Sequence, residues 1–424
     1  MDLPNYKKRI IDEQVDTYLG TFGAVLIEGP KWCGKTWTAK KHSNSEFLLA
    51  DPKGNFNNKR LALMDPSFVL EGATPRLIDE WQEVPALWDA VRGWVDTHPA
   101  SGQFLLTGSA TINKHRYIHT GTGRIARLKM RTMSLYESGY SSGLVSLEDI
   151  CNNVAPNVMT GEVQLKDLIR YILLGGWPLV TDSSIEKGLL IAKEYVKSVL
   201  NEDIYKIDDV ERDSHKVELL LRSLARNEAT TASNAILVKD IKDKDFDDVN
   251  VDTLANYMDI LKNLHLIENI PPYSSKFRSG IRVKQSEKRH FVDPSLPCAL
   301  LGLTEKKLLG DLELLGFLFE SMVERDLWTY TESFGAKLFH YQDYKNNEMD
   351  AVIELPDGAW CGVEIKLGAN KIDEAAENLL RIQDAIKASN GKTAQALCVI
   401  CGLANAAYRR PDGVYVVPIT ALKN

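Results

Sequence analysis

The sequence contains no long apolar run and few cysteines. No uninterrupted apolar stretch in its 424 residues approaches the roughly 18 residues that a membrane-spanning helix needs. The first residues carry no signal-peptide core, so we expect a cytoplasmic protein without membrane contact. The six cysteines are scattered, which favours reduced thiols over a disulfide framework. Cys398 and Cys401 form a C-x-x-C, but this spacing puts them on opposite faces of an apolar strand, and we interpret both as core residues.

The chain also lacks an excess of positive charge. Its formal net charge is −7 at pH 7. A protein that wraps duplex DNA without reading its sequence needs a basic stripe that displaces counterions. Binding of nucleic acid would therefore require a local basic patch. Hydrophobic residues make up 44% of the sequence and charged residues 26%, which is typical of a globular protein, and the length allows two to four domains.

The most informative segment is an apolar strand followed by a glycine-rich loop. Residues 25–27 lead into a sequence that fits G-x-x-x-x-G-K-[ST] at every fixed position. Such a loop turns successive N–H groups into one concavity, and the helix that begins at Lys35 adds its positive dipole end. We predict that Lys35 reaches the β- and γ-phosphates of ATP and that Thr36 binds Mg²⁺. The predicted nucleotide-binding residues are Gly29, Pro30, Lys31, Trp32, Cys33, Gly34, Lys35, Thr36 and Trp37.

A predicted strand at residues 76–80 ends in two consecutive carboxylates. We predict that Asp79 holds Mg²⁺ through water and that Glu80 orients or deprotonates the attacking water. Without the phosphate loop, the two acids would be read as caps of the following helix. Another predicted strand delivers Thr107, which could touch the γ-phosphate or the water, because ligands lie at strand carboxyl ends in doubly wound sheets. A simple turn at the strand end is the alternative for Thr107.

A glycine-rich loop at residues 121–123 precedes two arginines. Arg124 could neutralise transition-state charge in its own or a neighbouring subunit. Arg127 is a weaker candidate for the same role. Either residue could instead be an ordinary surface arginine.

These motifs together resemble the AAA+ ATPase module of a widespread prokaryotic family, in which the ATPase is fused to a C-terminal domain of unknown function. The matching segments are residues 75–82, 106–109, 123–124, 133–137, 174–178 and 193–203. The last two are similar to the family's Gly-Gly-aromatic-Pro signature in a helical lid and to its linker helix. Met133 stands where a proline is usual. The resemblance implies that Asp79 and Glu80 are the Walker B pair and that Thr107 is the sensor residue.

Helical periodicity dominates residues 214–266, and a predicted hairpin follows up to residue 292, a pattern that describes a winged helix. Residues 239–262 carry seven acids and four lysines, so this would-be recognition helix would repel phosphate. The predicted wing is basic and could hold the backbone of DNA or RNA, although a solvated hairpin explains the same charges. Its basic residues are Lys276, Arg278, Arg282, Lys284, Lys288 and Arg289.

The C-terminal part carries a second possible chemistry. Glu364 and Lys366 are two residues apart on a predicted strand and therefore share one face, and Asp350 lies near the end of the paired strand. An acid followed by E-x-K on the paired strand is the arrangement of the PD-(D/E)xK nuclease fold. There Asp350 and Glu364 would bind Mg²⁺, Lys366 would position the water, and Glu320 on the preceding helix could complete the site. A surface hairpin with ordinary charged residues is the alternative.

We therefore predict an α/β protein with four parts. These are a P-loop AAA+ (ASCE-type) ATPase domain with a parallel sheet at 1–135, a helical lid and linker helix at 136–212, a winged helix at 213–295 and a PD-(D/E)xK-like α/β domain at 296–424. The leading hypothesis is Mg²⁺-dependent ATP hydrolysis coupled to the last two parts and acting on nucleic acid. The alternative is an ATP-dependent protein-interaction switch whose nuclease fold is inactive. A DNA-binding regulator without turnover is weaker, because Glu80 is present. The expected cofactors are ATP and Mg²⁺, and oligomerisation stays open.

Overall fold

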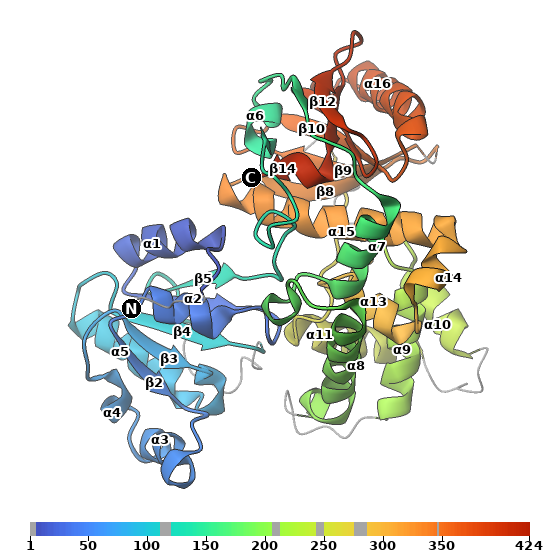
Figure 1. Cartoon of the computed structure of the whole chain (residues 1–424). Coiled ribbons are helices and arrows are strands. Elements are labelled where there is room, and N and C mark those ends of the chain that lie inside the picture. Colours follow the sequence, from blue (N-terminus) through green and yellow to red (C-terminus); the bar gives the residue numbers. More distant parts are fainter. Residues whose placement is uncertain (1–5, 111–119, 206–212, 243–249, 275–285, 346) are drawn as a thin grey trace.

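The computed structural model describes residues 6–110, 120–205, 213–242, 250–274, 286–345 and 347–424. Figure 1 shows three regions: an N-terminal α/β region in blue and cyan, a middle helical region in green and yellow, and a C-terminal α/β region in orange and red. The helical region lies beside the first sheet in this view, and the C-terminal region lies above both. Within the described ranges, no helix is both long enough and apolar enough to cross a bilayer.

The N-terminal region is built on a five-stranded parallel sheet in the order β2-β3-β4-β1-β5. Its strands are β1 (Ala24–Glu28), β2 (Ser45–Leu48), β3 (Arg76–Asp79), β4 (Phe104–Gly108) and β5 (Ile125–Lys129). Its helices are α1 (Ile11–Thr21), α2 (Lys35–Lys41), α3 (Lys53–Met64), α4 (Ser67–Leu70) and α5 (Ala86–Thr97), with a 3₁₀ turn at Trp81–Glu83. The central β4 is buried along its whole length, because α1 and α2 pack on one face of the sheet and α5 on the other.

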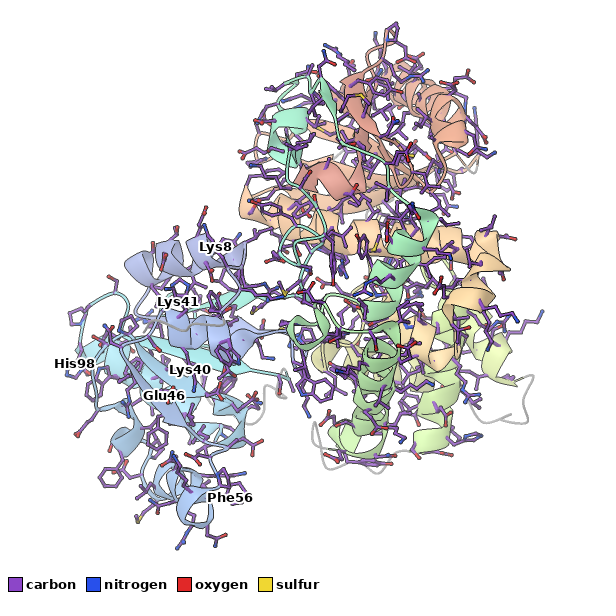
Figure 2. All side chains as sticks on the ribbon, in the orientation of Figure 1. Lys8, Lys40, Lys41, Glu46, Phe56 and His98 are labelled. Carbon is purple, nitrogen blue, oxygen red and sulfur yellow. The ribbon has the colours of Figure 1, made fainter. Side chains whose placement is uncertain are left out.

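Helix α3 begins later than its bounds suggest. Gly54, Asn55 and Phe56 have positive φ angles of 61°, 59° and 57°, so regular helix starts only at residue 57. Phe56 lies at the outer end of the N-terminal region and is 47% exposed (Figure 2).

The middle region is a helical body around one apolar core. Its elements are α7 (Leu165–Leu174), η3 (Pro178–Val180), α8 (Ile185–Asn201), η4 (Asp203–Tyr205), α9 (Ser214–Arg226), α10 (Asn234–Lys242), α11 (Val251–Asn263), α13 (Ser295–Leu300) and α14 (Glu305–Leu309). After α11 the chain forms antiparallel bridges that join Ile267 to Phe291 and Ile270 to Lys288. The predicted wing residues between 275 and 285 and the acids between 243 and 249 lie outside the described residues.

The C-terminal region is a seven-stranded mixed sheet in the order β7-β12-β13-β11-β10-β9-β8. Its main elements are α15 (Leu312–Ser333), β8 (Lys337–Gln342), β9 (Glu348–Glu354), β10 (Trp360–Lys366), α16 (Ile372–Ala388), β11 (Ala396–Cys401), β12 (Ala406–Arg409), β13 (Tyr415–Pro418) and β14 (Leu422–Lys423). Helix α15 covers one face of the sheet and α16 the other. Cys398 and Cys401 are buried on opposite faces of β11, as predicted, and all six cysteines are free and buried.

The segment after the first sheet departs from our prediction. We expected residues 136–212 to form the lid and linker helix. Instead, β6 (Val145–Ser146) pairs with β14, β7 (Val158–Met159) extends the C-terminal sheet, and α6 (Leu147–Cys151) packs into the core of that region. Of this segment, only α7, η3, α8 and η4 belong to the middle helical body.

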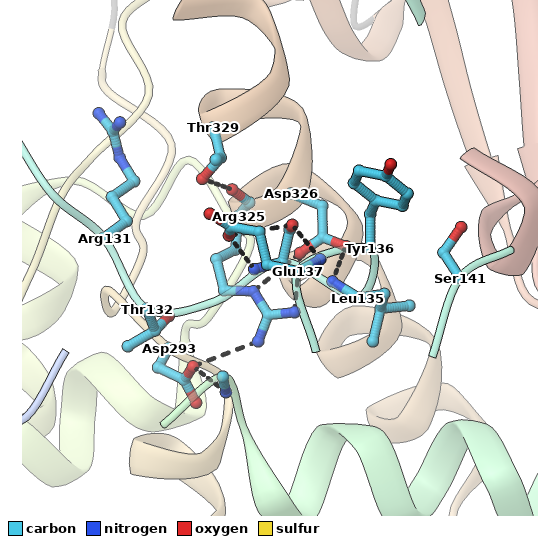
Figure 3. Close-up of polar contacts among 12 residues, drawn as sticks. Arg131, Thr132, Leu135, Tyr136, Glu137, Ser141, Asp293, Arg325, Asp326 and Thr329 are labelled. Carbon is cyan, nitrogen blue, oxygen red and sulfur yellow. Dashed lines mark hydrogen bonds and ion pairs between the residues drawn. The ribbon is translucent and has the colours of Figure 1, made fainter. Parts of the chain in front are cut away.

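A buried ionic network joins the three regions. Arg325 on α15 donates to Asp293 Oδ2 at 3.2 Å and to the neighbouring Asp326 at 2.7 and 3.0 Å (Figure 3). Asp326 in turn accepts the Leu135 N–H at 2.8 Å, and Asp293 accepts the Gly176 N–H at 2.8 Å. Because a Cβ at Gly176 would lie 2.1 Å from the carbonyl oxygen of residue 133, the second glycine of the Gly-Gly-aromatic-Pro segment is required by close packing.

Candidate functional site

The phosphate loop connects the carboxyl end of β1 to the first turn of α2. Gly34 caps α2 with φ 108°, a conformation that favours glycine. A Cβ at Gly29 would lie 2.0 Å from the Met130 carbonyl oxygen, so the loop packs directly against the end of β5. Both glycines of the motif are therefore required by the backbone.

Lys35 is buried and bound by its own loop. Its Nζ donates to the Gly29 carbonyl at 3.0 Å and to the Pro30 carbonyl at 2.8 Å, and the residue is 4% exposed. The Lys35 ammonium thus donates to two carbonyls the hydrogen bonds that it would otherwise donate to phosphate oxygens. Lys35 therefore has to exchange neutral carbonyl partners for charged ones when an anion enters the loop, an exchange that charge-assisted hydrogen bonds favour.

The candidate Mg²⁺ ligands lie together at the carboxyl edge of the sheet. The Thr36 hydroxyl donates to Asp79 Oδ1 at 2.8 Å, and the Thr107 hydroxyl donates to the same oxygen at 2.6 Å. Three elements, α2, β3 and β4, thus converge on one carboxylate. A hydroxyl and a carboxylate beside a phosphate loop form an oxygen donor set suited to Mg²⁺.

Glu80 is held by neighbours that the sequence did not identify. It has a left-handed backbone, with φ 56° and ψ 48°, immediately after β3. Its Oε2 accepts hydrogen bonds from Gln82 Nε2 and from the Ser109 hydroxyl, the latter at 3.0 Å. Its N–H donates to Thr107 Oγ1 at 3.1 Å. The carboxylate therefore has a defined position at the same edge as Asp79.

A large cavity surrounds the phosphate loop. Its volume is about 1390 Å³, above the range of roughly 300–1,000 Å³ that is usual for small-molecule sites. The loop side contributes Trp32 and Trp37, which are 49% and 50% exposed. The middle region contributes the other side, with lining residues Pro178, Leu179, Tyr195, Val199, Asp203 and Tyr205. Ligands in this cavity would contact both regions.

Sequence reasoning missed two residues that hold the phosphate loop, Arg9 and Asp203. Arg9, which is 4% exposed, donates to the Cys33 carbonyl at 2.7 Å and forms an ion pair with Glu137 at 2.9 Å. Lys31 forms a 2.6 Å ion pair with Asp203, which lies 172 positions further along the chain. Contacts between residues so far apart in sequence leave no local sequence pattern. Only residues 133–137, which match the family and include Glu137, could have indicated one of these contacts.

Arg124 lies at the opposite edge of the sheet. Its carbonyl accepts the N–H of Ala24, the first residue of β1, whereas the phosphate loop follows the last residue of that strand. A strand of this length separates the two by roughly 16 Å. Arg124 therefore does not reach the phosphate loop of its own chain, and its side chain pairs with Asp96 at 2.7 Å. Arg127 pairs with Glu28 at 3.1 Å and stacks on Trp88.

Two residues of the predicted basic wing are buried. Lys288 is 6% exposed and Arg289 is 7% exposed, so the prediction that they face a phosphate backbone is wrong. Arg289 donates to the Ala232 carbonyl at 2.8 Å, and Lys288 faces carboxylates of α15. The other four basic residues, Lys276, Arg278, Arg282 and Lys284, lie outside the described residues.

The predicted nuclease residues lie close together, but lysines occupy their carboxylates. Lys366 Nζ contacts Asp350 Oδ2 at 3.1 Å and Glu364 Oε2 at 2.6 Å. Lys288 contacts Glu320 and reaches the Asp350 carbonyl at 3.2 Å. Burial acts to raise the pKa of Asp350, but the two lysines hold that pKa below its usual value. In the part of the chain that the structure describes, no group of three or more His, Cys, Asp or Glu residues is arranged to hold a metal, so Glu320 does not complete a three-carboxylate site with Asp350 and Glu364.

The phosphate loop, the acids that end β3 and the order of the parallel strands define the N-terminal region as a P-loop nucleotide-binding fold. Residues 21–139 match a family model described as an AAA domain, so the chain carries an AAA-type ATPase domain. Two further matches are described as Domain of unknown function (DUF8612), over residues 165–307, and Domain of unknown function (DUF4143), over residues 315–422.

The chain is similar to two curated mycobacterial proteins. These are uncharacterized protein Mb2031c of Mycobacterium bovis and uncharacterized protein Rv2008c of Mycobacterium tuberculosis, each 25% identical over 346 residues, which is 81% of this chain and 70% of the relative. Among solved structures, the Walker-type ATPase PABY2304 of Pyrococcus abyssi aligns with 68% of this chain and 94% of its own, at 12% identity and a TM-score of 0.42. The Hef helicase domain of Pyrococcus furiosus aligns with 93% and 86% of the two chains, at 11% identity and a TM-score of 0.19. Neither structural likeness is strong enough to carry a conclusion.

Proposed function

We propose that the protein binds ATP with Mg²⁺ in the cavity around the phosphate loop and hydrolyses it. The observation that carries this proposal is the convergence of Thr36, Asp79 and Thr107 through hydrogen bonds of 2.6 and 2.8 Å beside an intact phosphate loop. Thr36 and Asp79 would hold the Mg²⁺, which supplies positive charge at the phosphates when bound. Lys35 would bind the β- and γ-phosphates in exchange for its present carbonyl partners.

Glu80 is the candidate base for the attacking water. It lies one residue beyond Asp79, and Gln82 and Ser109 fix its carboxylate. A positioned carboxylate next to the Mg²⁺ ligands can orient a water and accept its proton. Thr107 would keep Asp79 and the Glu80 backbone in register, because it bonds to both.

The middle region would respond to the nucleotide. Six residues between positions 178 and 205 line the same cavity, and Lys31 of the loop is paired with Asp203 across it. A triphosphate competes with Asp203 for the Lys31 ammonium, so binding would alter the contact between the two regions. The expected output is a change in how the middle and C-terminal regions are held.

We propose a winged helix for residues 213–295 and a PD-(D/E)xK-type frame for the C-terminal sheet. The three helices α9–α11, followed by antiparallel bridges, support the former, and the Asp350 and Glu-x-Lys side chains on paired strands support the latter. A specific observation favours the switch hypothesis, in which this frame is inactive and the partner is a protein: Lys288, which lies outside the Glu-x-Lys motif, occupies the Glu320 carboxylate. Binding of DNA or RNA would fall to the wing residues outside the described ranges, and Arg124 could act only across a subunit contact.

Two substitutions test the ATPase proposal in the purified chain. Lys35→Ala should abolish ATP binding, measured by calorimetry. Glu80→Gln should bind ATP as the unmodified protein does but lose at least 10²-fold in hydrolysis rate, because the base is gone while the phosphate contacts stay. An unchanged hydrolysis rate in Glu80→Gln would remove Glu80 from the mechanism, and unchanged ATP binding in Lys35→Ala would move the nucleotide elsewhere.

A further inference from the structure

One of the carboxylates predicted to bind a metal in the C-terminal region, that of Glu320, faces a lysine from a different region. Lys288 precedes α13 and belongs to the bridged segment of the middle region, whereas Glu320 and Glu324 are one helical turn apart on α15. The Lys288 Nζ contacts Glu320, lies 2.7 Å from Glu324 Oε1 and donates to the Asp350 carbonyl at 3.2 Å. It therefore has oxygen partners on both α15 and β9.

The contact is buried on all sides. The side chain of Lys288 is 7% exposed, that of Glu320 15% and that of Glu324 1%. An ammonium group removed from water is stable only when several oxygen atoms replace its hydration. The Lys288 side chain is therefore held in one position in the packed interior, unlike an exposed lysine beside an acidic surface patch.

Asp350 and Glu364 also accept contacts from donors of the chain. Asp350 Oδ2 accepts the Ile365 N–H at 2.7 Å as well as Lys366 Nζ at 3.1 Å. Glu364 accepts Asn378 Nδ2 at 2.7 Å and contacts Lys366 at 2.6 Å. A divalent ion bound to Asp350 Oδ2 and Glu364 Oε2 would have to displace Lys366, and one bound to Glu320 Oε1 would have to displace Lys288.

We propose that Lys288 takes the place of a metal ion in this cluster and thereby anchors the middle region to the C-terminal sheet. The ammonium group gives the cluster an internal cation that cannot diffuse away. The cluster is then a permanent joint between regions instead of a metal-dependent cleavage site. His290 continues the joint on the same segment, where it contacts Glu228 at 3.2 Å and Glu324 at 3.1 Å.

Binding of Mn²⁺ to nucleotide-free, chelator-treated protein tests the proposal. Thermal unfolding of the unmodified protein should show no Mn²⁺-dependent rise in Tm. Paramagnetic resonance of free Mn²⁺ should show the same amount of bound Mn²⁺ in the unmodified protein and in Asp350→Asn. A rise in Tm of several degrees that Asp350→Asn abolishes would overturn the proposal, because the cluster would then bind a metal ion although Lys288 is in place. This part of the test needs no substitution of Lys288. The Asp350→Asn variant distinguishes Mn²⁺ bound at the cluster from Mn²⁺ bound at the Thr36 and Asp79 site.

Removal of the lysine gives the complementary result. Lys288→Met should lower Tm by roughly 10 °C, since it leaves buried carboxylates without a cation. Mn²⁺ should restore part of that loss in Lys288→Met but not in Lys288→Met with Asp350→Asn. The matched control is Lys262→Met, at a partly exposed pair with Glu287, which should change Tm by less than about 2 °C. A Tm in Lys288→Met equal to that of the unmodified protein would contradict the anchor.

Discussion

At the scale of single residues, the nucleotide site is a set of charged groups that already have partners within the chain. Lys35 is bound to loop carbonyls, Lys31 to Asp203, and Glu80 to Gln82 and Ser109. The sequence predicted the loop and the acids, because both belong to short motifs whose chemistry depends on neighbouring residues. It could not predict Arg9 or Asp203, whose contacts with the loop span 24 and 172 positions.

The pair between Lys31 and Asp203 yields a prediction at this scale. Asp203→Asn should tighten the binding of ATP several-fold, because Lys31 then has no carboxylate to leave when phosphates arrive. Titration calorimetry with ATP and with tripolyphosphate would measure the effect, which should be similar for both ligands.

A second substitution serves as the control for this prediction. Lys31→Met in the Asp203→Asn background should cancel the gain, since the ammonium that moves to the phosphates is missing. If the gain persists without Lys31, the effect of Asp203 does not pass through the ion pair.

At the scale of elements, the strands and helices of the N-terminal region follow from periodic patterns. The predicted strands that end at Asp79 and deliver Thr107 are β3 and β4 of the sheet. The short strands β6 and β7 were not predicted. Each has two residues, too few for any alternation to be visible, and their partners lie more than 200 positions away.

The Gly-Gly-aromatic-Pro segment gives a prediction for an element boundary. Gly176→Ala should destabilise the protein by about 2 kcal/mol, because the added methyl group meets the backbone of residue 133. Gly316→Ala on α15 is the matched control, since its Cβ would enter open space and alanine favours helix; it should be neutral or stabilising by up to about 1 kcal/mol. Denaturant unfolding would measure both, and equal effects would show that close packing at residue 176 is unimportant.

At the scale of the whole molecule, Arg131 ties the first sheet to both other regions. Its guanidinium contacts Glu268 of the middle region at 2.7 Å and Glu332 on α15 at 2.6 Å. Lys129 adds a second contact to Glu268 at 2.8 Å. The sequence offered no sign of this junction, since isolated charges in three separate segments look like surface residues until the fold is known.

This junction predicts a loss of stability in acid. Burial acts to raise the pKa of Glu268, but Arg131 and Lys129 lower it to about 2. A lowered carboxylate pKa contributes stability that is complete above the ordinary value of 4.5 and is lost as the pH falls through 2, here about 3 kcal/mol. Glu268→Gln should lack this part of the pH dependence in urea unfolding between pH 6 and pH 2.5. Glu377→Gln, at an exposed position of α16, should retain it.

The pairing of β6 with β14 and of β7 with the C-terminal sheet decides how the molecule can be divided in the laboratory. A fragment that begins at residue 296 omits α6, whose Leu147, Ile150 and Cys151 fill the sheet core, and so it exposes an apolar surface there. A fragment that ends before residue 140 avoids that problem but loses the Lys31 partner. Expression trials should therefore keep residues 141–160 together with residues 312–424, joined on one polypeptide.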